Sequence, residues 1–189
     1  MSTIGLDIGT SSISLAAWEH GSKAVLETQT IPHDSFLPGD PPRARRQDPE
    51  AIWELAGAAL KDMLQRHPQA RALGLTGQMH GILYVTSAGW ACSPLYTWEN
   101  GYGDLPFPGG SGQSFAEELS RLTGYPMATG FGLVTYFYHT QTGQVPAEAA
   151  AFCTIHDYIA MRLAGAARPV TDPGDAASLG LFSLDKGAF

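Results

Sequence analysis

The chain has 189 residues and carries 18 acidic against 11 basic side chains, which gives a formal net charge of −7. Hydrophobic residues make up 44% of it, a share that fits a folded globular protein and excludes an intrinsically disordered one. The acidic balance argues against nucleic acid or an anionic membrane as the main partner. No apolar run approaches the roughly 20 residues that span a bilayer, and Asp7 interrupts the short apolar start of the chain, so neither a membrane span nor a signal peptide is predicted. The two cysteines, Cys92 and Cys153, have no metal-ligand spacing, which favours free thiols in a reducing cytoplasm.

The first part of the chain predicts three antiparallel strands joined by tight turns. Apolar residues alternate with small or polar ones over 4–8 and again over 13–17, and the segment 24–31 provides a third strand. The proline-rich stretch 32–47 has little periodicity. We expect it to be an exposed loop whose arginines are solvated.

A long helix is predicted from 49 to 66. Asp48 is a good N-cap, and one continuous apolar stripe runs along the helix as far as Leu64. Pro68 prevents continuation, and the apolar run 72–76 predicts a buried strand. A strand, a helix and a strand in this order imply a parallel pairing with a right-handed crossover.

The remaining elements are shorter. They are a small hairpin at 82–85, a helix at 114–123 with Phe115, Leu119 and Leu122 facing inward, a helix around 134–141, a buried strand at 150–154 and a helix at 156–164. The last segment, 166–189, is expected to be irregular, so one domain over 1–189 has its core at about 1–165. The order βββαβαβα predicts an α/β fold with a mixed central sheet, the ribonuclease-H-like arrangement of actin, Hsp70 and hexokinase-type sugar kinases.

A first candidate site follows the first strand. Asp7 stands at the strand end, and the turn Gly9, Thr10, Ser11 comes next. Glycine allows a ligand to approach the backbone, and turn N–H groups and hydroxyls can donate to phosphate oxygens. Asp7 would then face Mg²⁺, through water because this ion gives up its waters reluctantly. The alternative is a plain hairpin turn in which Asp7 caps local N–H groups.

A second candidate site follows the strand at 72–76, where ligands of α/β folds collect. Gln78, Met79 and His80 lie between two glycines. Gln78 and His80 can hydrogen-bond sugar hydroxyls, and Met79 can contact a carbon face. The alternative is a structural histidine beside a core methionine. The chain has no Walker loop, GxGxxG, HExxH or GxSxG motif, which argues against the enzyme classes that these motifs mark.

Taken together, the motifs resemble those of the FGGY family of carbohydrate kinases. The matching segments are DIGTSS at 7–12, GQMHG at 77–81, TWENG at 97–101, ATGFG at 128–132, TIHDY at 154–158 and TDPGDAASLG at 171–180. Within the family the chain is most similar to the sedoheptulokinases, and next to the xylulokinases.

The resemblance implies an intact enzyme that moves the γ-phosphoryl of ATP to a sugar hydroxyl, with Mg²⁺, between two ribonuclease-H-like domains. Asp7 would hold Mg²⁺ through water, and Gly9, Thr10 and Ser11 would hold phosphate. The residues that the resemblance assigns to the sugar are Gln78, Met79, His80, Trp98, Gly130 and Phe131. Where relatives have Asp-Gly-Arg after the tryptophan, this chain has Glu99 and Asn100 followed by Gly-Tyr, so an arginine contact is missing.

Other motif residues are expected to be structural. Asp157 would cap its helix, Tyr158 would pack in the core, and His156 would have no chemical role. Asp172 and Asp175 match a different family segment from the catalytic base, so neither is expected to replace it.

The resemblance places the catalytic base, an Asp, beyond Phe189, in a segment before the second domain. We therefore expect no catalytic base in this chain, an absent C-terminal ATP-binding domain, and little or no catalysis by the chain alone. The expected partners are a small sugar, ATP and that missing domain, and the face left uncovered favours a homodimer. Two alternatives stay open: a xylulokinase-like or other polyol or aldonate kinase, and a non-catalytic sugar-sensing or interaction domain.

Overall fold

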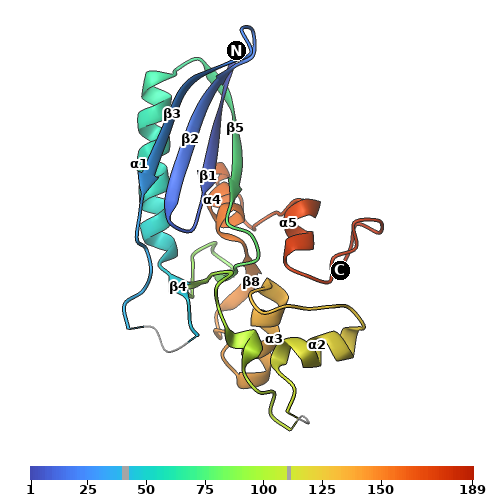
Figure 1. Cartoon of the computed structure of the whole chain (residues 1–189). Helices are drawn as coiled ribbons and strands as arrows, with labels where there is room; N and C mark the ends of the chain where they lie inside the picture. Colours follow the sequence, from blue (N-terminus) through green and yellow to red (C-terminus); the bar gives the residue numbers. More distant parts are fainter. Residues whose placement is uncertain (40–42, 110–111) are drawn as a thin grey trace.

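The computed structural model describes residues 1–39, 43–109 and 112–189 (Figure 1). Its elements in chain order are β1 (Ser2–Ile8), β2 (Ser12–Glu19), β3 (Ala24–Pro32), β4 (Arg46–Gln47), α1 (Pro49–Arg66), β5 (Ala70–Gly77), β6 (Leu83–Thr86), β7 (Leu95–Tyr96), the 3₁₀ helix η1 (Tyr102–Asp104), α2 (Phe115–Thr123), α3 (Gly132–Thr142), β8 (Ala149–Cys153), α4 (Ile155–Ala164) and α5 (Pro173–Ser178).

A four-stranded mixed sheet in the order β3-β2-β1-β5 forms one part of the molecule. The first three strands are an antiparallel meander, and β5 pairs parallel to β1 after the α1 crossover. Asp7 lies opposite Thr76 in this pairing, and Ile8 lies opposite Gly77. Both strands therefore end at the same edge of the sheet, and the two candidate sites that follow them become neighbours. The predicted meander and parallel crossover are confirmed.

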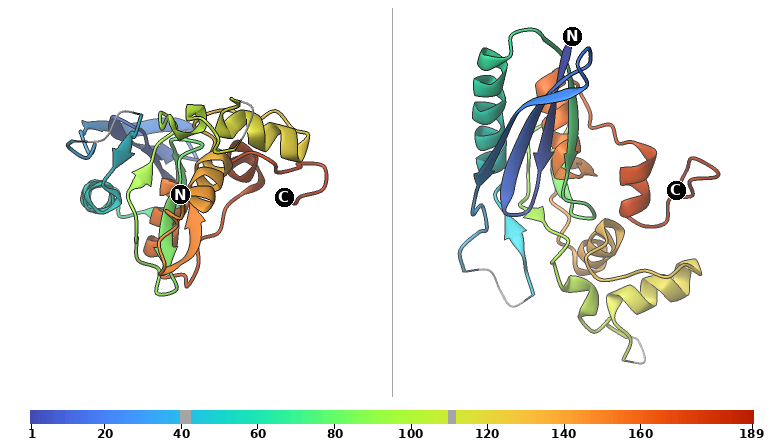
Figure 2. Two further views of the ribbon diagram at one scale, coloured as in Figure 1. Left: turned by 90° about the horizontal axis from the view of Figure 1, so that it is seen from below. Right: turned by 45° about the horizontal axis from the view of Figure 1, so that its top comes forward.

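One face of this sheet forms the main core with α1 and α4. The alternating residues Ile4, Leu6 and Ile8 of β1 are at most 1% exposed in this core. Helix α1 has the predicted bounds because the Asp48 carboxylate accepts hydrogen bonds from the backbone N–H groups of Glu50 and Ala51. Figures 1 and 2 show α1 lying along the sheet.

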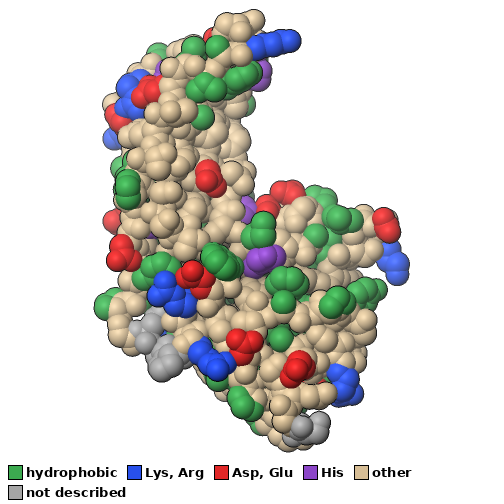
Figure 3. Space-filling model, viewed as in Figure 1, with side chains coloured by type: hydrophobic (Ala, Val, Ile, Leu, Met, Phe, Trp, Pro, Cys, Tyr) green, Lys and Arg blue, Asp and Glu red, His purple; other side chains and the backbone are tan. Residues whose placement is uncertain are grey.

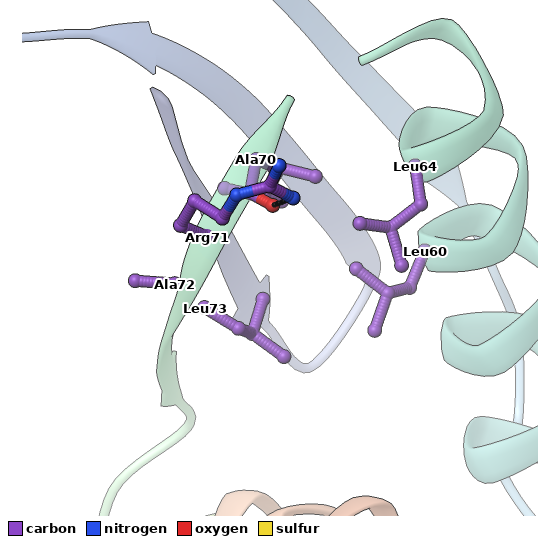
Figure 4. Close-up of a pocket in the computed structure, with 7 residues that line it drawn as sticks. Leu60, Leu64, Ala70, Arg71, Ala72 and Leu73 are labelled. Atoms are coloured by element: carbon purple, nitrogen blue, oxygen red, sulfur yellow. Dashed lines mark hydrogen bonds between the residues drawn. The ribbon is translucent and has the colours of Figure 1, made fainter. Parts of the chain in front are cut away.

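The end of the predicted apolar stripe of α1 is not in the core. Leu64 is 42% exposed, against the expectation, and it faces a shallow hollow of about 360 Å³ between α1 and β5. Leu60 points into the same hollow from α1, and Leu73 and the stem of Arg71 border it from β5 (Figure 4). The start of β5 therefore lies beside the last turn of α1 but does not bury Leu64.

The other face of the sheet is lined by small and polar side chains. Gly5, Asp7, Gly74 and Thr76 are exposed on it, and it borders a hollow of about 430 Å³. Alternation places the apolar side chains of β1 on the core face, so Asp7 lies on this open face.

The second part of the molecule contains α2, α3, η1 and two small sheets (Figures 1 and 2). Strand β8 pairs antiparallel with β6, and only Cys153 of it is buried, so the expectation of a buried strand holds for its end alone. Helix α2 begins with a capping box between Ser114 and Glu117. Leu122 was expected to face inward but is 57% exposed, although it follows the buried Leu119 by one turn on the same side of α2, so the packing that covers Leu119 does not extend over the last turn of the helix.

Two irregular segments are more ordered than expected. The stretch 32–47, of which 40–42 lie outside the described residues, contains β4 and the fully buried Gln47, since β4 pairs with β7. The segment 166–189 contains α5, capped by Asp172. Leu179 is only 4% exposed and its carbonyl oxygen accepts from the N–H of Leu133 in α3. In the described ranges no helix combines the length and the apolar character that crossing a membrane requires.

Candidate functional site

The carboxyl ends of β1 and β5 border a hollow of about 430 Å³. Figure 3 shows the surface hollowed between the sheet and the part of the chain that carries α5. The residues that line this hollow, called the sheet-edge hollow below, are Asp7, Gly9, Thr10, Gly77, Gln78, Met79, His80 and Trp98. The two motifs that the sequence separates by about 70 residues thus form a single site.

The turn after β1 offers free hydrogen-bond donors. The N–H of Gly9 donates to the Ser12 carbonyl oxygen at 2.9 Å, which closes the turn. In the ranges that the structure describes, the backbone N–H groups of Thr10 and Ser11 have no partner, and neither has the carboxylate of Asp7. Two unpaired N–H groups in a tight turn suit an anion, and an exposed carboxylate beside them suits a hydrated Mg²⁺.

A chain of hydrogen bonds joins the two sides of the hollow. The indole N–H of Trp98 donates to Oγ1 of Thr10 at 3.0 Å, and this hydroxyl donates to Oε1 of Gln78 at 3.4 Å. Gln78 in turn donates to Gln47 at 2.9 Å, and Gln47 donates to the carbonyl oxygen of Thr10 at 2.7 Å. Gln78 and Gln47 are 8% and 0% exposed, so the network is rigid and dry on its inner side.

Gln47 is a site residue that the sequence analysis missed. It lies in the stretch read as an exposed loop, immediately before the helix cap Asp48. A single buried glutamine leaves no periodic signal, so only the fold reveals it. His33 was missed in the same way: its Nε2 lies 3.2 Å from the carbonyl oxygen of Gly9.

Contacts with residues outside the sheet-edge hollow fix the orientation of the His80 ring. Its backbone has φ +68°, a left-handed conformation that few non-glycine residues adopt. Its ring stacks on Phe131 with centroids 4.7 Å apart, and its Nδ1 makes a short contact with the carbonyl oxygen of Ser178 in α5. With Nδ1 donating to that carbonyl, Nε2 is the acceptor that remains for a ligand in the hollow.

Gly130, Phe131 and Ser11 do not line the hollow. Gly130 has φ +90°, and a Cβ there would lie 2.1 Å from the carbonyl oxygen of Trp98. Only glycine lets this loop lie against the backbone of Trp98. Gly130 and Phe131 thus support Trp98 and His80 from outside the cavity, while Ser11 offers its backbone beside it.

The arginines of the 32–47 stretch are not simply solvated. Arg45 pairs with Glu99 at 3.1 Å and lies over the ring of Phe36 at 4.0 Å. Arg43 lies 3.9 Å from Asp104. These contacts hold the loop before α1 against the segment that follows Trp98, although the arginine side chains stay about half exposed.

The start of α4 differs from expectation. Thr154, not Asp157, caps the helix, because its side chain accepts from the Asp157 N–H at 3.2 Å. Burial raises the pKa of the Asp157 carboxyl, and hydrogen bonds from Thr154 and Thr171 oppose this rise. Tyr158 is fully buried, as expected. His156 is 4% exposed and lies against Gly77, where a Cβ would be 2.9 Å from its Nδ1.

Residues 2–189 match the FGGY family of carbohydrate kinases, N-terminal domain. The chain belongs to this family. Sedoheptulokinase from Homo sapiens is 30% identical to this FGGY domain, and sedoheptulokinase from Mus musculus is 29% identical. Each alignment covers 96% of the chain and 42% of the relative, so the chain spans less than half the length of these relatives. Xylulose kinase from Streptomyces coelicolor is 24% identical over 98% of the chain and 38% of its own length.

Solved structures confirm the fold of the FGGY domain. A ligand-bound xylulose kinase from Lactobacillus acidophilus superposes on 100% of this chain with a TM-score of 0.77 at 18% identity, covering 38% of that protein. A gluconate kinase from Lactobacillus acidophilus superposes on 97% with a TM-score of 0.78 at 19% identity, covering 37% of that protein. The predicted α/β fold of the actin and hexokinase type, with a mixed sheet, is therefore confirmed.

Proposed function

We propose that this chain is the sugar-binding part of an ATP-dependent carbohydrate kinase whose acceptor is a ketose such as sedoheptulose. The observation that carries the proposal is the sheet-edge hollow, in which the turn after β1, with its unpaired N–H groups, and the segment Gln78-Met79-His80 face one space. The family match supports the reaction class, because its members are carbohydrate kinases. The similarity to sedoheptulokinases over nearly the whole chain favours the ketose.

On the phosphate side, the free N–H groups of Thr10 and Ser11 would donate to the terminal phosphate of ATP. Asp7 would hold Mg²⁺ through bound water, and this ion would neutralise phosphate charge when it is bound. The fit rests on the exposed Asp7 carboxylate, which has no side-chain partner among the described residues.

On the sugar side, Nε2 of His80 would accept a hydrogen bond from a sugar hydroxyl. The side-chain oxygen of Gln78, Oε1, accepts a hydrogen bond from the Thr10 hydroxyl, and Gln78 lines the same hollow. Trp98 and Met79 are 47% and 54% exposed, and they would cover the carbon face of the sugar. Removal of these apolar surfaces from water would add to the affinity.

The rest of the reaction is proposed to need a further domain. The relatives are more than twice as long as this chain, and we propose that the general base and the adenosine site lie in the part it does not cover. Closure of the two domains would exclude water from the reacting phosphate. A cytoplasmic location and self-association through the face that the further domain would cover remain predictions, the first supported by the two free cysteines.

The test is ADP release with Mg²⁺ from ATP by this chain and by the complete gene product, with sedoheptulose, D-xylulose and gluconate. We expect sugar-dependent release from the longer protein, fastest with sedoheptulose, and little from this chain. A different preferred sugar would replace the ketose assignment. Sugar binding without ADP release by any form would contradict the kinase and favour a sugar sensor.

A further inference from the structure

Three metal-ligating side chains form a cluster behind the sheet-edge hollow, at the junction of β5, α4 and α5. His156 and Asp157 come from the first turn of α4, and Asp175 comes from α5. One potential ligand atom of each lies within 4.8 Å of the other two. His156 and Asp157 are 4% and 6% exposed, so the cluster is largely shielded from water.

The geometry at His156 is not that of a hydrogen-bonded pair. Nε2 of His156 lies 2.8 Å from Oδ2 of Asp175, yet neither ring nitrogen has a hydrogen-bond partner in the described ranges. In a hydrogen bond the N–H points at the oxygen. Two ligands of one metal ion instead lie side by side, because both point at a third position about 2.0–2.2 Å from each. The close backbone of Gly77 is on the Nδ1 side, so Nε2 is the nitrogen that faces the carboxylate.

The negative charge of the two carboxylates also favours a bound cation. Two carboxylates lie next to a buried imidazole, and burial of an uncompensated carboxylate is unfavourable. Among the described residues no lysine or arginine makes an ion pair with Asp157 or Asp175. The Thr154 and Thr171 side chains favour the charged form of the Asp157 carboxyl and oppose the rise in its pKa that burial causes.

We propose that His156, Asp157 and Asp175 bind one divalent transition-metal ion, of the zinc or manganese class. One imidazole nitrogen with two carboxylate oxygens is a donor set that suits these ions. The site is distinct from the Mg²⁺ position proposed at Asp7. Its role is structural, because the ion would tie α5 to α4.

An ion held by His156, Asp157 and Asp175 would also affect the sheet-edge hollow. Helix α5 carries Ser178, whose carbonyl oxygen orients the ring of His80. Six residues form α5, so it has little stability of its own. An ion at Asp175 would therefore fix α5, and with it the orientation of the histidine that faces the sugar.

The test is isothermal titration of the chelator-treated chain with ZnCl₂ and, separately, with MnCl₂. We expect one ion per chain and a rise in Tm on saturation. D175N and H156Q should each lower the affinity at least tenfold and abolish the rise in Tm. E27Q is the matched control, because Glu27 meets His67 at 2.7 Å in a partly buried histidine–carboxylate pair that has no second carboxylate beside it in the described ranges, and it should bind like the wild type.

Circular dichroism of the metal-free variants separates a lost site from a lost fold. If H156Q does not fold, D175N decides the matter, since the Asp175 side chain is 29% exposed on a short helix. Absence of one-to-one binding by either ion, or binding that D175N leaves unchanged, would overturn the proposal and leave the three side chains as structural residues only. Neither ATP nor sugar enters this experiment, so its result does not depend on the proposed kinase function.

Discussion

The indole N–H of Trp98 donates to the hydroxyl of Thr10 at 3.0 Å, across 88 residues of sequence. The contact joins the proposed wall of the sugar site to the proposed phosphate turn. One hydrogen bond therefore couples the position of Trp98 to that of the turn. The same Thr10 hydroxyl donates to the side-chain oxygen of Gln78.

Replacement of Trp98 by Phe should weaken sugar binding by the proposed full-length kinase. Phenylalanine keeps an apolar wall but cannot donate to Thr10, so we expect KM for the sugar to rise about tenfold, the equivalent of about 1.4 kcal/mol. The measurement is a steady-state sugar titration. W90F is the control, because Trp90 is 57% exposed against 47% for Trp98 but lies beside Arg162 and does not line the hollow. Equal effects of the two substitutions would contradict the role given to Trp98.

Replacement of Asp7 by Asn should abolish phosphoryl transfer while the fold stays intact. Asp7 is exposed and has no side-chain partner in the described ranges, so its charge is not needed for packing. We expect kcat to fall by at least about 100-fold, since charge neutralisation and positioning carry this reaction. ADP release and urea unfolding, measured together on the complete kinase, provide the check. D34N tests for a general effect of lost charge, and an active D7N enzyme would remove Asp7 from the proposal.

Replacement of Gly130 by Ala should destabilise the domain strongly. The new Cβ would lie 2.1 Å from the carbonyl oxygen of Trp98, in a left-handed conformation, so the backbone must move. We expect a loss of more than about 2 kcal/mol in the free energy of unfolding. G143A is the matched control: Gly143 has φ +68° but nothing within 4 Å, so the cost there should be about 1 kcal/mol. Urea unfolding of both variants distinguishes the contact with Trp98 from conformational strain alone.

Replacement of Gln47 by Ala should leave two buried polar groups without their partner. The Gln78 side-chain amide and the Thr10 carbonyl oxygen both bond to Gln47. We expect a loss of about 1–3 kcal/mol in the free energy of unfolding, and weaker sugar binding because Gln78 is no longer held. Q65A, on the exposed side of α1, should change stability by less than about 0.5 kcal/mol. A stability of Q47A equal to that of Q65A would show that the network contributes nothing.

The domain should lose stability in mild acid through His139. Burial lowers the pKa of His139 from 6.5 to about 4, and its Nδ1 lies 2.9 Å from the hydroxyl of Tyr84. The unfolded chain therefore binds a proton more readily than the folded chain. The contribution of neutral His139 is complete above about pH 6.5 and declines as the pH falls towards 4, by about 3 kcal/mol in total.

The check is urea unfolding at pH 7.5 and pH 4.5 of the wild type, H139Q and, as a control, H20Q at the exposed His20. H139Q should be less stable at pH 7.5 but should lose less stability on acidification than the wild type. H20Q should behave as the wild type does. An identical pH dependence in all three proteins would show that His139 is not the group responsible.

The sequence by itself determined the local elements and the two motifs of the site. The cap at Asp48 and the apolar period of α1 gave its bounds, because capping and amphipathic burial act within a few residues. Alternation placed Ile4, Leu6 and Ile8 in the core. The DIGTSS and GQMHG motifs indicate phosphate and sugar chemistry from the residue types that they contain.

Only the tertiary structure decided which residues complete the site. Gln47 and His156 lie in segments whose local pattern predicts a loop and an ordinary helix start. Helix α5 has six residues, too few to show a period, and its Ser178 reaches His80 across 98 residues of sequence. Leu64 and Leu122 show the converse, since an apolar stripe predicts a face and not what covers that face. Periodicity reports one element at a time, whereas burial and hydrogen-bond partners depend on which elements meet, and that is settled by packing of the whole chain.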